Sequence, residues 1–244
     1  MLALLSDIHA NLEALDACLL HAARSGATRW EFLGDLVGYG ADPQAVIETV
    51  MRYAAGGAVV VKGNHDAAVE TTEAGMSDGA AETRDWTRGV LDATAKAWLR
   101  SLPLTHREDE LCFVHASAAA PGRWEYVNDT VRAQRSVVAA GARWVFCGHV
   151  HDQALYVEVA ADKMTRFRPL PGSTVPVPGH RRWLAIVGSV GQPRDGNPSA
   201  AYALFDRERE LLTFHRVPYD HAAAARKLRA AGLPDLITSW RPRR

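Results

Sequence analysis

The chain opens with LALLSDIHANLEALDACLL, residues 2–20, and this stretch contains the unit from which the fold is predicted. The apolar run Leu2–Ser6 is typical of a strand that is buried on both faces. Asn11 can cap a helix in which leucine and alanine recur at helical spacing. Asp7 and His9 stand between the strand and the helix. The stretch therefore predicts a strand, a loop with ionisable side chains, and a helix.

The same alternation continues through the first half of the chain. Trp30–Leu33 and Ala58–Val61 are predicted strands. A helix is predicted from Asp42-Pro43, with proline at the first helical position, through about Tyr53. Strands that alternate with helices indicate a parallel sheet with crossover connections. A longer amphipathic helix is expected over Glu82–Arg100.

The second half has a different rhythm. Strands are predicted at Leu111–Val114 and Trp144–Cys147, with a helix near Thr130–Ala140 between them. After Gly148 the strands become shorter and Gly- and Pro-rich turns separate them, which favours antiparallel pairing. These later strands and a last helix are predicted at Ala154–Val159, Thr165–Phe167, Trp183–Val187, Ala201–Phe205, Leu211–Val217 and Asp220–Ala231. No linker or repeat interrupts the pattern, so residues 1–244 are expected to form a single domain.

Composition excludes several classes of function. The 244 residues are 48% apolar and 23% charged, which is ordinary for an enzyme with a sizeable core. With 28 basic and 28 acidic residues, no net charge points to a nucleic-acid polymer or an anionic membrane. The three cysteines lack CxxC spacing and are expected to be reduced core residues. No apolar run has the ~18 residues of a membrane span, and no signal peptide is visible, so a cytoplasmic protein is expected.

Five polar blocks follow predicted strands within the first 151 residues. They are Asp7-Ile8-His9, Gly34-Asp35, Gly63-Asn64-His65-Asp66, His115 and Gly148-His149-Val150-His151. Sites in open α/β sheets form outside the carboxyl ends of the strands, so we expect the blocks to converge on one edge. Residues two apart within a block are expected to share a face of extended backbone. The glycines of these blocks allow tight turns and close approach to a metal or phosphate.

The side chains of the blocks are carboxylate, imidazole and amide groups, without a thiolate. This mixture of oxygen and nitrogen ligands suits Mn²⁺, iron or Zn²⁺ better than a soft metal. Two divalent ions that share a carboxylate can clamp the attacking and leaving oxygens of a phosphoester. The blocks therefore indicate a two-metal phosphoesterase.

The blocks DIH, GDLVGYG, GNHD, VHAS and GHVH resemble the calcineurin-like metallophosphoesterase superfamily, and the resemblance runs nearly end to end. Residues 6–15 and 188–196 are similar to its bacterial YfcE-like branch of small phosphodiesterases and phosphatases. The resemblance implies a four-layer α/β/β/α sandwich of two mixed sheets. It also implies a binuclear phosphoric ester hydrolase that attacks phosphodiesters or small phosphomonoesters with a two-metal-activated hydroxide. Manganese is the expected metal, with iron, zinc and nickel left open.

The resemblance also implies a role for each residue of the blocks. The first ion would be held by Asp7, His9 and His151, the second by Asn64, His115 and His149, and both by Asp35. His65 would be the acid that protonates the leaving oxygen, and it is counted with Asp35 as catalytic. Asn64 is also a candidate for substrate contact, and Arg194, outside the blocks, is a second candidate. The expected partner is a small phosphoester, and a homo-oligomer is left open.

Several features keep alternatives open. Asp66 either orients His65 or caps the next segment. Gly188–Gly196 is either a plain turn or a loop whose amides or Arg194 face the substrate or a neighbouring subunit. Specificity is expected to lie in Thr71–Ala81 and Ala116–Asn128. Within the second loop, the aromatic residues of Trp124-Glu125-Tyr126 either wall the substrate cleft or pack in the core.

The second block departs from the pattern of two related activities. Protein serine/threonine phosphatases and dinucleoside-tetraphosphate hydrolases resemble GDxxDRG there, whereas this chain has Gly38-Tyr39-Gly40. The missing Asp and Arg argue against both activities. Competing functions on the same fold are a slow nucleotide-binding regulator and a non-catalytic interaction scaffold. The complete ligand set and His65 disfavour the scaffold.

Overall fold

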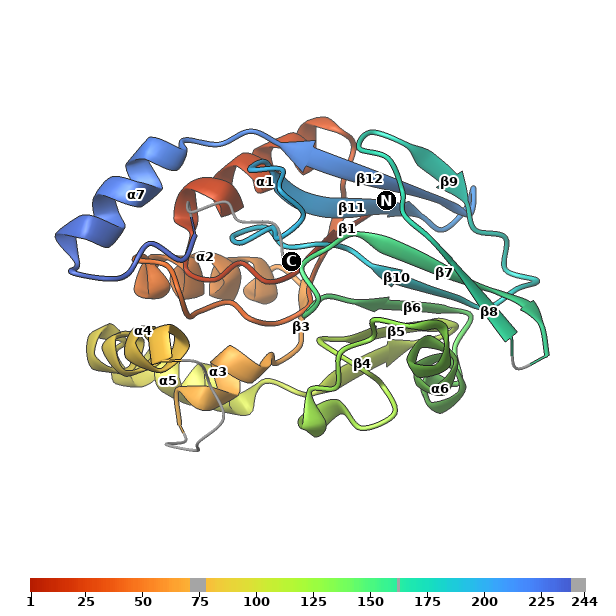
Figure 1. The fold of residues 1–244 in the computed structure, drawn as a ribbon, viewed down its shortest axis with the longest axis horizontal. Helices are drawn as coiled ribbons and strands as arrows, with labels where there is room; N and C mark the ends of the chain where they lie inside the picture. The colour runs from red at the N-terminus through yellow and green to blue at the C-terminus, as the bar shows by residue number, and fades with distance from the viewer. Residues whose placement is uncertain (71–77, 162, 238–244) are drawn as a thin grey trace.

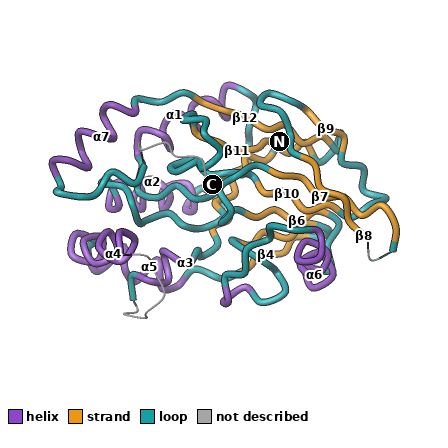
Figure 2. Tube along the Cα trace, in the orientation of Figure 1, coloured by secondary structure: helices purple, strands orange, loops and turns teal. Residues whose placement is uncertain are grey.

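The two sheets of the molecule pack face to face, as the computed structural model in Figure 1 shows. The structure describes residues 1–70, 78–161 and 163–237. The first sheet has the strand order β3-β2-β1-β11-β12-β9 and the second has the order β4-β5-β6-β10-β7-β8. Figure 2 shows the helices outside the strands, with α1 and α2 beside the first sheet and α6 beside the second. The predicted α/β/β/α sandwich is confirmed.

The first sheet begins with the predicted parallel unit. β1 pairs in parallel with β2, and β2 in parallel with β3. β11 adds to the other side of β1 in antiparallel fashion, and β12 and β9 follow. The strands of this sheet are β1 (Leu2–Leu5), β2 (Arg29–Phe32), β3 (Val59–Val60), β9 (Thr174–Pro176), β11 (Ala200–Asp206) and β12 (Leu211–Val217). The carboxyl ends of β1, β2 and β3 therefore meet at one edge.

The second sheet also mixes the two directions. Its strands are β4 (Thr105–Glu108), β5 (Leu111–Val114), β6 (Trp144–Cys147), β7 (Ala154–Ala160), β8 (Lys163–Phe167) and β10 (Trp183–Ile186). Antiparallel pairing after Gly148 is found for β7 with β8, but β10 pairs in parallel with β6. β10 also pairs antiparallel with β7, so the later strands pair with one another as predicted, and the parallel contact of β10 is with β6, which precedes Gly148.

Seven α-helices are found among the described residues. They are α1 (Leu12–Arg24), α2 (Pro43–Ala55), α3 (Asn64–Ala68), α4 (Asp78–Val90), α5 (Ala93–Ser101), α6 (Thr130–Ala140) and α7 (His221–Ala230), and a 3₁₀ turn spans Pro121–Arg123. The single helix expected over Glu82–Arg100 is wrong. The chain breaks after Val90, and the Asp92 side chain caps α5 by accepting a hydrogen bond of 2.7 Å from the Ala95 amide. The strands β4 and β9 and the helix α3 were not predicted, because β4 is polar (Thr105–Glu108) and β9 and α3 are too short to show a period.

Three apolar layers hold the sandwich together. One lies between the first sheet and its helices, one between the two sheets, and one between the second sheet and α6. The three cysteines are free and buried, as predicted. Within the described part of the chain, the helices are too short or too polar to cross a membrane.

A charged cluster joins the edges of the two sheets. Arg29 on β2 donates to both carboxylate oxygens of Glu108 on β4, at 2.9 and 2.7 Å. The Glu31 side chain is only 1% exposed, and one of its oxygens lies 3.3 Å from the same guanidinium. Its other oxygen has no hydrogen-bond partner among the described residues. Burial raises the pKa of Glu31 to about 8, although Arg29 opposes the shift.

We expect Glu31 to make the stability of the protein depend on pH. Between the ordinary pKa of 4.5 and the folded value of about 8, the folded chain keeps a proton that the unfolded chain has lost. The free energy of unfolding should therefore fall by about 1.4 kcal/mol for each pH unit within this window. Above the window it should no longer change through Glu31.

The test is urea unfolding of the wild type and of Glu31→Gln between pH 4.5 and 9. The variant should lose most of the slope. Glu110→Gln, in the exposed turn between β4 and β5, is the matched control and should keep it. An unchanged slope in Glu31→Gln would show that other groups cause it.

Candidate functional site

The five polar blocks meet at one edge of the sandwich. Asp7 follows β1, Asp35 follows β2, and Asn64 begins α3 just after β3. His115 follows β5 in the second sheet, and the block that contains His149 follows β6. Both aspartates and all the histidines of the predicted ligand set are buried. The expected convergence is found, and it draws residues from both sheets.

The backbone of the blocks differs from the prediction. Five of the side chains stand on residues with positive φ, namely Asp7 (52°), His9 (51°), Asp35 (52°), His149 (64°) and His151 (70°). The expected extended backbone is therefore wrong here, because these residues adopt the left-handed conformation that non-glycine residues rarely enter. Main-chain hydrogen bonds hold the turns. The Asp7 amide donates to the Gly34 carbonyl at 3.0 Å, and the His9 amide donates to the Asp35 carbonyl at 2.9 Å. Such strain commonly marks a functional site.

Glycine is required where the blocks approach one another. A Cβ on Gly63 would lie 2.2 Å from Oδ1 of Asp35, and one on Gly148 would lie 2.2 Å from Oδ2 of Asp7. Both contacts are far shorter than real Cβ atoms allow. These glycines therefore let the blocks approach one another, whereas the predicted approach to a metal or phosphate stays a prediction.

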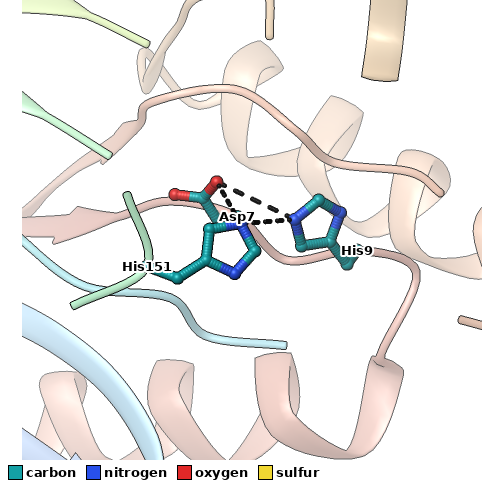
Figure 3. A group of neighbouring side chains, drawn as sticks. All are labelled: Asp7, His9 and His151. Carbon is teal, nitrogen blue, oxygen red and sulfur yellow. Dashed lines mark hydrogen bonds and ion pairs between the residues drawn. The ribbon is translucent and has the colours of Figure 1, made fainter. Parts of the chain in front are cut away.

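Asp7, His9 and His151 form the first group of side chains, shown in Figure 3. The Oδ1 atom of Asp7 lies 3.1 Å from Nε2 of His151 and 3.8 Å from Nε2 of His9. The two imidazole Nε2 atoms are 3.2 Å apart. Three ligand atoms of the kinds that bind a divalent cation therefore face a common point.

Asp35, His115 and His149 form the second group. The Nε2 atom of His115 is 3.3 Å from Oδ2 of Asp35 and 3.1 Å from Nδ1 of His149. The side-chain oxygen of Asn64 is 3.1 Å from the same Nε2 atom. Oδ2 of Asp35 is also 3.8 Å from Nε2 of His9, so this carboxylate stands between the two groups.

Backbone carbonyls orient three of the rings. Nδ1 of His9 lies 3.2 Å from the Val37 carbonyl, and Nδ1 of His115 lies 2.8 Å from that of Leu33. For the His151 ring, the carbonyl of Gln192 is 2.6 Å from Nδ1. A carbonyl only accepts hydrogen bonds, so these contacts assign the proton to Nδ1. The lone pair of each Nε2 is then directed into the site, as in metal-binding histidines.

The electrostatic balance favours ionised carboxylates. Burial would raise the pKa of Asp7 and Asp35, but the neighbouring histidines hold both values well below the usual range. His115 shows the reciprocal effect, since Asp35 overcomes burial and raises its pKa to about 9. Burial lowers the pKa of His149 to about 3. The site is thus a buried set of anionic oxygens and imidazole nitrogens.

His65 lies beside both groups. Its amide donates to Oδ1 of Asp35 at 2.8 Å, and its ring packs against His9 and Tyr39 with centroid distances of 5.0 and 4.6 Å. Its Nδ1 atom is buried and has no hydrogen-bond partner among the described residues. Burial lowers the pKa of His65 despite the opposing charge of Asp35. This nitrogen lies against Gly38, since a Cβ on that glycine would be 2.5 Å from it.

The structure confirms a capping role for Asp66, whose side chain accepts a hydrogen bond from the N-cap residue of α3, and adds contacts to a second loop. Its Oδ1 accepts hydrogen bonds from the amides of Leu36 at 2.9 Å and Val37 at 3.3 Å, and its Oδ2 accepts one from Gly63 at 2.9 Å. Asp66 thus ties the loop after Asp35 to the turn that carries Asn64 and His65.

Gly188–Gly196 supports the first group from behind. The Gly191 amide donates to the Asp7 carbonyl at 2.9 Å, and the Ser189 hydroxyl donates to the same oxygen at 2.8 Å. The Gln192 carbonyl is the atom that orients His151. This support was not predicted, because it joins residues about 180 positions apart. The glycine-rich composition of the loop was the only signal in the sequence.

Arg194 reaches the site from the same loop. Its guanidinium donates to Oε1 of Gln192 at 2.6 and 3.1 Å and lies 6.0 Å from the centre of the Tyr39 ring. Nε2 of Gln192 in turn donates to the Leu236 carbonyl at 2.6 Å. The predicted substrate contact therefore stands beside Tyr39, which packs on His65.

Two aromatic residues of the Ala116–Asn128 loop cover the second group. Tyr126 stacks on His149 with a centroid distance of 4.0 Å, and Trp124 meets His115 edge-on at 5.9 Å. Tyr126 is 40% exposed, so it forms part of the rim. Most of the other proposed specificity loop, residues 71–77, lies outside the described residues.

Comparisons with known proteins agree with this geometry. The model of the calcineurin-like phosphoesterase superfamily domain matches residues 1–210. The chain is 35% identical in sequence to a metallophosphoesterase from Sphaerobacter thermophilus whose crystal structure is known, and the two structures match with a TM-score of 0.86. The match covers 97% of each chain. An uncharacterized protein of Methanocaldococcus jannaschii is 33% identical over 97% of this chain and 95% of its own. The chain therefore belongs to the calcineurin-like phosphoesterase superfamily, as its sequence blocks predicted.

A third relative has a more specific name. The symmetrical bis(5'-nucleosyl)-tetraphosphatase of Methylococcus capsulatus is 36% identical over 129 residues. The match spans 49% of this chain and 44% of that protein.

The close approach at Gly63 gives a prediction. Gly63→Ala should lower the free energy of unfolding by about 3 kcal/mol or more, because the new Cβ collides with Asp35 and its backbone. Gly89→Ala is the matched control, since a Cβ there meets no atom within 4 Å. Gly89 lies in α4, so alanine should be neutral or stabilising by up to ~1 kcal/mol. Urea unfolding checks both variants, and equal stability of the two would contradict the packing described.

Proposed function

We propose that the protein is a divalent-metal-dependent phosphoesterase with a binuclear centre. The observation that supports this proposal best is the position of Asp35, whose Oδ2 atom faces His9 of the first group and His115 of the second. One carboxylate between two sets of nitrogen and oxygen ligands is the arrangement that a pair of dications requires.

The donor atoms fit a pair of such ions. Asp7 Oδ1 is buried and accepts no hydrogen bond from the described residues, and the Nε2 atoms of His9 and His151 face each other at 3.2 Å. A cation between such lone pairs would satisfy them. In the proposed assignment, Asp7, His9 and His151 hold one ion, Asn64, His115 and His149 hold the other, and Asp35 holds both. Manganese is the proposed metal, with iron, zinc and nickel as alternatives.

When bound, the two ions would lower the pKa of water and neutralise the charge of the phosphoryl group. The chain supplies the rest. His65 is the proposed general acid, since its amide donates to Asp35 and its ring packs against His9, between the two groups of ligands. Burial lowers its pKa, and an anionic phosphoester next to the ring would raise it again. The protonated ring could then donate its proton to the leaving oxygen.

Asn64 and Arg194 are the proposed substrate contacts. The guanidinium of Arg194 lies over Tyr39, the residue that occupies the position of the missing arginine in GDxxDRG. A cation supplied by a later loop can therefore serve the phosphate in its place. This arrangement supports a small phosphodiester or phosphomonoester as the substrate.

A dinucleoside tetraphosphate is the second candidate substrate, favoured by the match to the tetraphosphatase, which spans 49% of the chain. We expect it to be poorer than an activated aryl phosphodiester, because residues 38 and 39 lack the Asp and Arg of that block. Rates on bis-p-nitrophenyl phosphate and on diadenosine tetraphosphate, measured with the same manganese-loaded protein, decide between them. A higher kcat/KM on the tetraphosphate would overturn the preference for esters.

Other parts of the proposal rest on the sequence. We propose one domain over residues 1–244, a cytoplasmic location, and a small phosphoester as the partner, with a homo-oligomer left open. A slow nucleotide-binding regulator and a non-catalytic scaffold are the alternatives. The clustering of the full ligand set around Asp35 disfavours the scaffold.

Asp35→Asn should weaken the binding of both ions and nearly abolish hydrolysis. A neutral amide cannot balance two dications as a shared carboxylate does. Calorimetric titration of metal-free protein with Mn²⁺ measures the loss directly, and Asp109→Asn on the surface is the control. If Asp35→Asn binds Mn²⁺ like the wild type, Asp35 does not bridge.

His65→Ala should damage chemistry more than metal binding. A positioned general acid is worth about 10²–10⁴-fold, and the loss depends on the leaving group. A p-nitrophenolate leaves without a proton, whereas an alkoxide needs one. The variant should therefore lose far more activity on an alkyl ester than on a p-nitrophenyl ester.

Both substrates should be measured at matched manganese content, with His180→Ala at an exposed position as the control. Equal losses on the two esters would make His65 a binding residue. Loss of manganese in His65→Ala would instead make it a ligand, since His9, Asp35 and His65 also form a compact group.

A further inference from the structure

A pocket with charged lining residues lies beside the proposed metal centre. Its volume is about 290 Å³, and it lies between the loop before α6 and the first turns of that helix. The pocket is lined by Glu125, Tyr126, Asn128, Arg132 and Arg135. None of these residues belongs to the predicted ligand set.

Tyr126 connects the pocket with the metal centre. Its ring lines the pocket and also stacks on His149, at a centroid distance of 4.0 Å and an interplanar angle of 21°. A molecule whose phosphorus lies at the metal centre can therefore extend past Tyr126 into the pocket.

The cationic side chains of the pocket differ in what they already bind. Arg132 is held by Asp129 and by the side-chain oxygen of Asn128, the latter at 3.3 Å. Arg135 is exposed, and no hydrogen bond or ion pair joins it to another described residue. Its planar guanidinium is therefore available to a ligand.

The lining combines planar groups with both kinds of hydrogen-bonding group. Tyr126 and the two guanidinium groups offer flat surfaces for stacking. The arginines and the Asn128 amide can donate, and the Glu125 carboxylate can accept. A second phosphate would be repelled by Glu125, whereas a heterocycle with N–H donors and ring acceptors would use the whole set.

We propose that this pocket binds the base of a nucleoside phosphoester. The proposal rests on the proposed function, because it assigns the organic part of the substrate whose phosphorus lies at the metal centre. It names Tyr126, Glu125 and Arg135 as the residues that distinguish a nucleotide from a simple phosphate ester.

A larger cavity lies elsewhere and does not compete for this role. It has a volume of about 530 Å³ and is lined by Glu110, Arg143, Glu158 and Arg182, among others. These residues lie near the ends of β5, β6 and β10 opposite to the polar blocks. Arg143 already pairs with Glu110 at 3.0 Å, and Arg182 lies 3.7 Å from Glu158.

The test compares ligands that differ only in the base. Calorimetry with manganese-loaded protein would measure the Kd of AMP, GMP, CMP and UMP against that of ribose 5-phosphate. We expect at least one nucleotide to bind about 5- to 100-fold more tightly than ribose 5-phosphate, because stacking of a base on aromatic groups has this magnitude. Arg135→Ala and Glu125→Ala should each reduce this ratio, by about fivefold or more. Arg229→Ala, at an exposed position of α7, should not change it.

The outcomes separate this proposal from the proposed function. If no nucleotide binds more tightly than ribose 5-phosphate, or if the ratio survives both substitutions, the base pocket is wrong, even when p-nitrophenyl esters are hydrolysed. If the ratio behaves as expected but no ester is hydrolysed, the pocket stands and the phosphoesterase proposal fails. Thermal unfolding of each variant verifies that it is folded.

Discussion

The structure depends on one constraint, the burial of two carboxylates among imidazole rings at the junction of two sheets. Asp7 and Asp35 are almost fully buried; each accepts a hydrogen bond from one backbone amide, at 2.9 and 2.8 Å, and histidine ring nitrogens lie at 3.1 to 3.8 Å. Ionised groups in such a place are costly unless cations or protons balance them. The surrounding chain keeps them there by strained left-handed turns and by glycines without room for a Cβ. A protein that did not use this charge would gain stability by losing it.

The loops around the site form a connected support. Asp66 ties the loop after Asp35 to the turn with His65. The segment from Ser189 to Gln192 holds the backbone of Asp7 and the ring of His151. Rotation of these ligands is therefore restricted before any substrate arrives. A site that stabilises the charge developing in a transition state requires such preorganisation.

The sequence was sufficient to predict the two-sheet fold and the convergence of the blocks, because parallel strands bring their carboxyl ends to one edge. Local patterns could not reveal the left-handed turns at Asp7 and His149, since the contacts that impose them join distant segments. The same reason hides the support by Ser189 and the stacking of Tyr126. The break between α4 and α5 was missed because the helical period continues across Asp92. Long-range contacts, rather than propensities, decide the details of the site.

The central claim is that this edge holds two metal ions that share Asp35. Anomalous diffraction from crystals soaked in Mn²⁺ tests it most directly, with the manganese content of the same protein measured in solution. We predict two anomalous peaks per chain, one beside His9 and His151 and the other beside His115 and His149, and two manganese ions per chain in solution. A single peak at saturating Mn²⁺, or peaks away from Asp35, would contradict the account.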